Sequence, residues 1–155
     1  RQLQGIFFLK DNNTSNNKTF VKHLAEDCKS NQVYKGILND RSKATYFSNT
    51  HVDQVAQKTE GYQLSKGILL SDNASYFSKP ELKIYADDVK CSHGSTIGPI
   101  DENAIFYLRS RGMSKIAATK ILISSFINEE LSSIDNEQMS EIIQKKLVRY
   151  LSKVK

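Results

Sequence analysis

The residues best suited to chemistry are concentrated between Tyr85 and Gly94, a segment that holds Asp87, Asp88, Cys91 and His93. In an extended segment Cys91 and His93, two positions apart, project from the same face. A thiolate and an imidazole on one face are suited to iron or zinc. Two ligands do not complete a site, and the chain has neither a Cys-x-x-Cys nor a His-x-x-x-His pair, so a metal here would need further ligands from a partner chain.

Other interpretations of the same segment stay open. It could be the end of a strand with a purely structural role, or a Cys-His nucleophile pair, although no oxyanion loop or orienting residue can be named for the latter. The chain contains no phosphate-binding glycine loop of either common kind, so any ATP chemistry should belong to a partner and the chain itself should not be an enzyme. His23 and His51 have no partners in sequence and are expected to be structural, and Cys28 should remain a free thiol.

The elements that must position these residues follow from a repeat. Gly5, Gly36 and Gly67 recur at equal intervals along the chain, and Gly98 stands at the next interval. The apolar residues of each repeat come in short bursts rich in strand formers, separated by Asn, Asp, Ser and Gly. A repeated coil of this kind predicts a mainly β fold, a right-handed parallel β-helix with about 31 residues per coil, flattened into two sheets, over residues 1–100. The glycines are expected at a stacked corner that requires positive φ.

After Pro99 the pattern becomes helical and predicts a three-helix subdomain over residues 101–155. Asp101 and Ser114 are expected to cap the first two helices, Gly112 to end the first, and Asp135 to precede the third. The third helix carries an apolar stripe with Met139, Ile143 and Leu147. Such a stripe must be buried, either against the neighbouring helices or against a partner.

Composition limits the remaining functions. The chain has 155 residues, 39% of them hydrophobic and 25% charged, with a net charge of +5, which is typical of one globular domain with an appendage. No apolar run is long enough to span a membrane. The lysines are spread singly between acidic residues, which argues against nucleic-acid binding. No signal segment is visible and the first residue is not Met, so we expect a cytoplasmic protein of which this is a piece cut from a longer polypeptide.

The most distinctive residues are the run Asp87-Asp88-Val89-Lys90-Cys91-Ser92-His93-Gly94 within Pro80 to Gly98, then Phe106-Tyr107-Leu108-Arg109-Ser110-Arg111-Gly112, and upstream His23, Cys28, Ser30, Gln32, Tyr34, Lys35, Gly36 and Ile68-Leu69-Leu70-Ser71-Asp72. Together they resemble the SufB/SufD family of the SUF iron-sulfur cluster assembly system, and the Cys-Ser-His triplet resembles its SufD branch.

The resemblance implies a scaffold subunit that pairs with a SufB-like paralogue through the β-helix. It also implies that the C-terminal helices dock a SufC-like ABC ATPase, with Met139, Ile143 and Leu147 as contact residues, and that Cys91 and His93 face SufB where transient iron or cluster is handled. No cofactor is expected in the isolated piece. An alternative is a carbohydrate-active enzyme on a parallel β-helix, which would want aromatic sugar platforms; Trp is absent.

Overall fold

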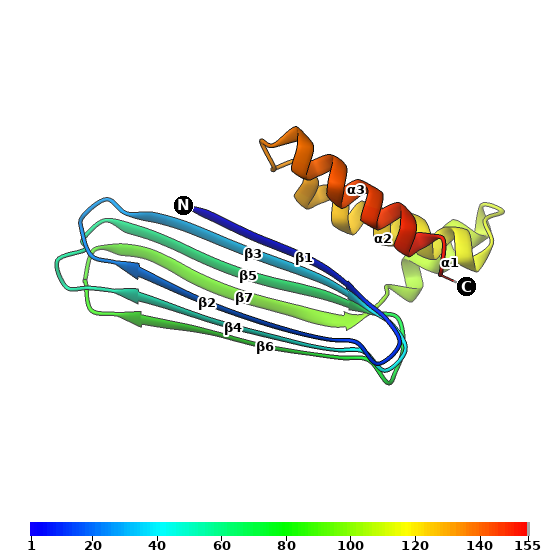
Figure 1. The fold of residues 1–155 in the computed structure, drawn as a ribbon, viewed down its shortest axis with the longest axis horizontal. Helices are drawn as coiled ribbons and strands as arrows, with labels where there is room; N and C mark the ends of the chain where they lie inside the picture. Colours follow the sequence, from blue (N-terminus) through cyan, green and yellow to red (C-terminus); the bar gives the residue numbers. More distant parts are fainter. Residues whose placement is uncertain (155) are drawn as a thin grey trace. The chain divides into compact units, whose positions relative to one another are not determined.

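The computed structural model describes residues 1–154, in which seven strands precede three helices (Figure 1). The strands are β1 Gln2–Leu9, β2 Thr14–His23, β3 Lys29–Leu38, β4 Lys43–Val52, β5 Thr59–Leu69, β6 Ser75–Ile84 and β7 Val89–Pro99. The helices are α1 Glu102–Ser110, α2 Lys115–Leu131 and α3 Glu137–Leu151. The chain forms two compact units, residues 1–98 and the described residues from Pro99 onward.

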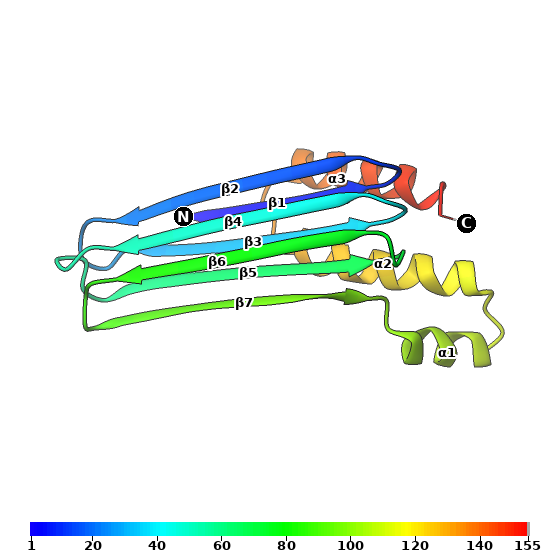
Figure 2. The same ribbon diagram turned by 90° about the horizontal axis from the view of Figure 1, so that it is seen from below.

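Successive strands alternate between two sheets, in the orders β1-β3-β5-β7 and β2-β4-β6. The pairs β1–β3, β3–β5, β2–β4 and β4–β6 are all parallel. The chain therefore winds as a flattened solenoid of about three turns with about 30 residues in each turn (Figure 2). The predicted parallel β-helix followed by helices is confirmed.

The coils differ slightly in length. Gln2 pairs with Asn31 and Thr14 with Lys43, whereas Lys29 pairs with Glu60, so the first coil is shorter than the second. As a result Gly36 stands beside Gly67, as the repeat predicts, but Gly5 stands beside Tyr34. The regular spacing of Gly5 and Gly36 in the sequence is not a structural register.

The prediction that these glycines occupy a corner with positive φ is wrong. Gly5, Gly36 and Gly67 lie inside β1, β3 and β5, and an aromatic ring occupies the space beside each one: Tyr34 at Gly5, Phe7 at Gly36 and Tyr76 at Gly67. The glycines are needed because a Cβ would collide with these rings.

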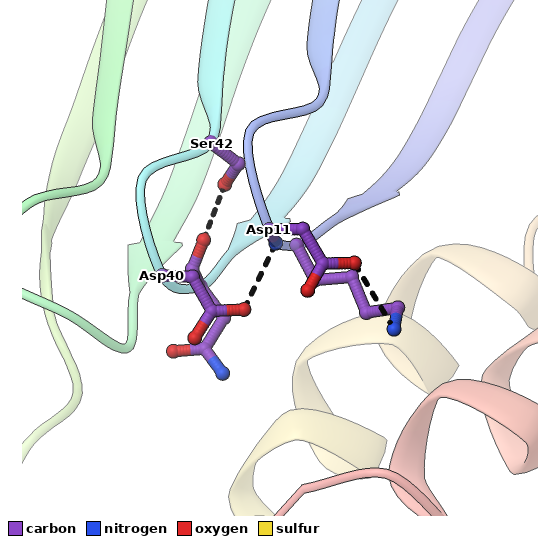
Figure 3. A network of polar contacts seen from close by, with 5 residues as sticks. Asp11, Asp40 and Ser42 are labelled. Atoms are coloured by element: carbon purple, nitrogen blue, oxygen red, sulfur yellow. Dashed lines mark hydrogen bonds and ion pairs between the residues drawn. The ribbon is translucent and has the colours of Figure 1, made fainter.

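Positive φ occurs instead in the turns, at Asp11, Asp27, Asp40 and Lys58. Aspartate accepts this conformation because its short side chain bonds to nearby backbone. The turns stack from coil to coil, since the Asp11 backbone N–H donates to Asp40 Oδ2 at 2.9 Å (Figure 3). Ser42 Oγ closes the second turn by donating to the Asn39 carbonyl at 2.7 Å.

One half of the solenoid interior is aromatic and apolar. Tyr46 is fully buried, and its ring stacks on Tyr34 with centroids 4.2 Å apart. Phe7 meets Tyr76 edge to face at 5.3 Å, and Leu38 and Ala44 complete the cluster. Burial raises the pKa of Tyr76 to about 12. The inward positions of this half thus form a dry core, whereas the other half is polar and bears on the site.

The helices begin and end largely where their capping residues predict. Asp101 accepts from the backbone of Asn103 and Ala104 at the start of α1, and Gly112, with φ of 93°, follows its end. Ser114 caps α2, and Asn136, the residue after Asp135, caps α3. Over residues 1–154, no helix has the length and apolar character to cross a membrane.

Candidate metal-ligand site at the end of the solenoid

The strand that carries Cys91 and His93 is the last one of the solenoid. β7 ends the four-stranded sheet, while the other sheet ends at β6 (Figure 2). The inward side of β7 therefore has no further strand opposite it in residues 1–98. His93 is exposed for this reason, although Gln32 and Gln63, at the equivalent positions of β3 and β5, are buried.

Cys91 lies near the start of β7, on its inward side. It is half-buried and packs with Val89 against the apolar cluster of Val52, Ala56 and Ala86. A Cβ at Gly61 would stand 3.2 Å from Cys91 Sγ, so the glycine leaves room for the thiol. Burial raises the pKa of Cys91, and a hydrogen bond from the Gly61 backbone offsets this only partly.

The contacts of β7 with β5 place His93 beside Gln63. Cys91 meets Gly61, Gly94 meets Leu64 and Ile97 meets Gly67, and the three contacts share one offset along the chain. The first two contacts bracket His93, which consequently stands next to Gln63 of β5. Cys91 and His93 then share the inward face, as the sequence predicts from their spacing.

The two aspartates before β7 do not join this pair. Asp87 and Asp88 are exposed in the connection from β6. The Asp88 backbone N–H donates to Gln57 Oε1 at 3.0 Å, and its carbonyl accepts from the Lys58 backbone at 2.6 Å. Within residues 1–154, no three His, Cys, Asp or Glu side chains gather closely enough to hold a metal ion.

The two other histidines, His23 and His51, make contacts typical of structural residues. His23 is buried, bonds to Ser30 Oγ at 2.8 Å, and has its pKa lowered chiefly by burial. His51 packs against Tyr85 with ring centroids 5.2 Å apart. Cys28 and Cys91 are both free thiols, as the sequence predicts.

Sequence reasoning missed a buried polar spine beside the site. Gln32 and Gln63 pair across β3 and β5, and both donate to Thr50 Oγ1, at 2.9 and 2.6 Å. The Gln32 carbonyl in turn accepts from Thr19 and Ser48. The repeat contained a signal for this spine, because Gln32-Val33 and Gln63-Leu64 match. Glutamine is usually exposed, however, so the match alone does not show that the two side chains point inward.

The apolar stripe of α3 divides into a buried and an exposed part. Leu147 is 1% exposed, so it is not accessible to a partner in this conformation, whereas Met139 is 48% exposed. Ile143 is half-buried, and Ile142 is exposed. Residues of α2 and α3, among them Leu131, Ser140 and Gln144, line an open hollow of about 730 Å³ on another side of α3 from Met139.

Folding also gathers lysines that the sequence spaces apart. The outer face of the β2-β4-β6 sheet carries exposed Lys18, Lys22, Lys43, Lys79 and Lys83, interleaved with Phe20, Phe47 and Phe77. Glu81 lies on the same face and is bound by Lys79 at 3.0 Å. The spacing of lysines along the chain therefore underestimated the charge of this face, while the absence of nucleic-acid binding stays a prediction.

A family model described as "SUF system FeS cluster assembly, SufBD core domain" matches residues 1–126, which include the whole solenoid, Cys91 and His93. The chain belongs to the SufBD core domain family. Its curated SufBD relatives include the "Iron-sulfur cluster assembly protein SufD" of Escherichia coli, which is 38% identical over 84% of this chain. A SufBD family protein of Synechocystis is 42% identical over 67% of it, and the SufD of Plasmodium falciparum 30% identical over 97%. This chain covers only 31%, 23% and 10% of those three proteins.

Proposed function

We propose that the chain is the C-terminal part of a SufD-like, non-catalytic scaffold subunit for iron-sulfur cluster assembly, with iron or a nascent cluster as its cargo. The observation that carries the proposal is the pairing of Cys91 and His93 on the uncovered inner side of β7. Membership of the SufBD core family and the printed names of the relatives support the same role.

The end of the solenoid is suited to a paralogous partner. In the described chain β7 pairs only with β5, so its outer edge offers unpaired backbone N–H and C=O groups. An extended segment of another β-helix can add to such an edge and cover the inner side at the same time. We assign this place to a SufB-like paralogue.

A partner at this edge would also complete the ligand set. One thiol and one imidazole hold a metal weakly, and two further ligands from the facing subunit would close a four-ligand site. Metal capture is then coupled to assembly, because the complete site exists only in the complex.

The helical unit is proposed to dock a SufC-like ABC ATPase. Met139 and Ile142 are exposed apolar residues on α3, and Ile143 is half-exposed beside them. Exposed apolar side chains that cluster on one face of a helix are typical of protein contact sites. Leu147 supports this surface from inside and does not contact the partner itself.

The test is co-purification of the full-length protein with its SufB-like and SufC-like partners, followed by iron and sulfide analysis. We expect Cys91→Ala and His93→Ala to lower the cluster yield while all three subunits still co-elute. His93→Ala should have the larger effect, because burial raises the pKa of the Cys91 thiol, which must lose its proton to bind a metal. Ser92→Ala, on the neighbouring exposed position, is the control. A normal cluster yield from the His93→Ala complex would refute the proposal.

A further inference from the structure

The buried polar atoms without a partner are confined to the last coil. In residues 1–154 the buried side-chain oxygens that lack any hydrogen-bond partner are Thr59 Oγ1, Gln63 Oε1 and Ser78 Oγ, all on β5 and β6. The first coils of this described chain show no such atom, and Gln32, the register neighbour of Gln63, has a fully used carbonyl. The polar spine is complete inside the solenoid and ends unsatisfied where β7 begins.

The orientation of the Gln63 amide is fixed by its surroundings. Gln63 Nε2 donates to Thr50 Oγ1 at 2.6 Å and to the backbone carbonyl of Glu81 at 3.3 Å. A carbonyl can only accept, so the nitrogen must face Glu81 and the oxygen must point the other way. Gln63 is 3% exposed, and leaving its carbonyl without a donor costs about 1–3 kcal/mol.

The nearest side chain in register that can supply this donor is His93. It stands beside Gln63 on the inward face of β7, and it is exposed. A ring nitrogen that donates to a buried carbonyl leaves the second nitrogen unprotonated and facing outward. Histidines that bind metals are commonly oriented in this way by a carbonyl or carboxylate.

We propose that Gln63 is a positioning residue for His93: its Oε1 accepts the ring N–H, which fixes one tautomer and directs the free nitrogen to the open mouth of the solenoid. The inference rests on the proposed function for the identity of the cargo, but the hydrogen bond itself is independent of it. Thr50 Oγ1 and the backbone carbonyl of Glu81 hold the Gln63 amide in place by accepting from its Nε2, so they support the position of the ligand.

The first experiment measures the tautomer of His93 in the metal-free full-length protein by ¹⁵N NMR of the imidazole ring, at a pH where the ring is neutral. We expect one tautomer in the wild type and both in Gln63→Met, which keeps the size but loses the acceptor. Gln63→Glu retains an acceptor oxygen and should restore the single tautomer. Gln32→Met removes an equally buried amide from the same spine without touching His93, and should leave the tautomer unchanged.

The second experiment measures Fe²⁺ affinity of the assembled complex for the same variants. Loss of an outer partner of a ligating histidine lowers metal affinity about 10- to 100-fold, so Gln63→Met should weaken Fe²⁺ binding by this factor and Gln63→Glu much less. A wild-type ring with mixed tautomers, or a ring insensitive to Gln63→Met in a folded protein, overturns the positioning role. If Gln63→Met does not fold, mixed tautomers in Gln63→Glu overturn the positioning role. A single tautomer in the wild type that is lost in Gln63→Met supports the hydrogen bond. If the cluster yield of His93→Ala is nevertheless normal, the proposed function is refuted and the hydrogen bond is not.

Discussion

The ring of Phe7 occupies the space where a side chain at residue 36 would begin. The two residues pair across β1 and β3, and a Cβ at Gly36 would overlap the ring atoms. Tyr34 is related to Gly5 in the same way across β1 and β3, whereas Tyr76 reaches Gly67 from the other sheet, so each glycine accommodates an aromatic ring of the core. These aromatic-glycine pairs let wide rings fill a solenoid whose two sheets lie close together.

Replacing Gly36 should therefore destabilise the solenoid by overpacking. We expect Gly36→Ala to lower the free energy of unfolding by about 1–3 kcal/mol, measured by urea denaturation of the full-length protein. Gly98→Ala is the matched control, because no atom lies within 4 Å of a Cβ at that position. Equal stabilities for the two variants would contradict the account, and Phe7→Leu in the Gly36→Ala background should recover part of the loss.

The fold could be predicted from the sequence because the repeat shows which segments form buried strands. Bursts of strand formers at a constant spacing identify stacked parallel strands, and Gly36 with Gly67 were paired correctly. Gly5 was misplaced because the first coil is shorter than the second, and coil length depends on turns that tolerate insertions. The glycines were assigned to corners because glycine in a sequence signals either positive φ or close approach, and only the three-dimensional neighbours distinguish the two.

The buried histidine gives a prediction for pH. Burial lowers the pKa of His23 in the folded state below its usual 6.5. The unfolded state therefore binds a proton first as the pH falls through 6.5, and stability decreases below that pH and is unaffected by His23 above it. Urea midpoints at pH 7.5, 6.0 and 5.0 should show a steeper acid loss in the wild type than in His23→Gln. A His23→Gln slope equal to the wild type would be inconsistent with a buried neutral ring.

The sequence identified Cys91 and His93 as candidate ligands, which stays a prediction, but it did not identify the residues around them. Cys91 and His93 were recognisable because thiol and imidazole at alternate positions of a strand are rare and chemically specific. Gln63 and Thr50 were not, because their side chains are usually exposed and only the register of β5 with its neighbours shows that they point inward. Leu147 was placed on the docking surface because a helical stripe alone does not tell which of its members the chain covers itself.

Substitutions on α3 should separate docking from folding. Met139→Asp changes an exposed residue and should alter stability by less than about 0.5 kcal/mol while weakening association with the SufC-like ATPase. Leu147→Asp places a charge at a site 1% exposed and should cost about 3 kcal/mol or more, so it should reduce folded protein rather than binding alone. Val148→Asp is the control, because Val148 is 59% exposed and lies about 180° around the helix from Met139. Pull-down and urea denaturation measure the two effects, and undiminished binding of the Met139→Asp variant would exclude this face.

The Cys91 thiol should react slowly with alkylating reagents at neutral pH. Burial against Val52 and Ala56 raises its pKa above the ordinary 9.0, so the nucleophilic thiolate is scarce at neutral pH. Alkylation by iodoacetamide, followed by mass spectrometry of the peptide that contains Cys91, should give a rate that rises with pH to a midpoint above 9.0. The urea-unfolded protein supplies the reference, with a lower midpoint for the same peptide. A folded midpoint at or below the unfolded one would contradict the burial argument. Because burial raises the pKa of the thiol, binding of a metal by Cys91 at pH 7 should release a proton.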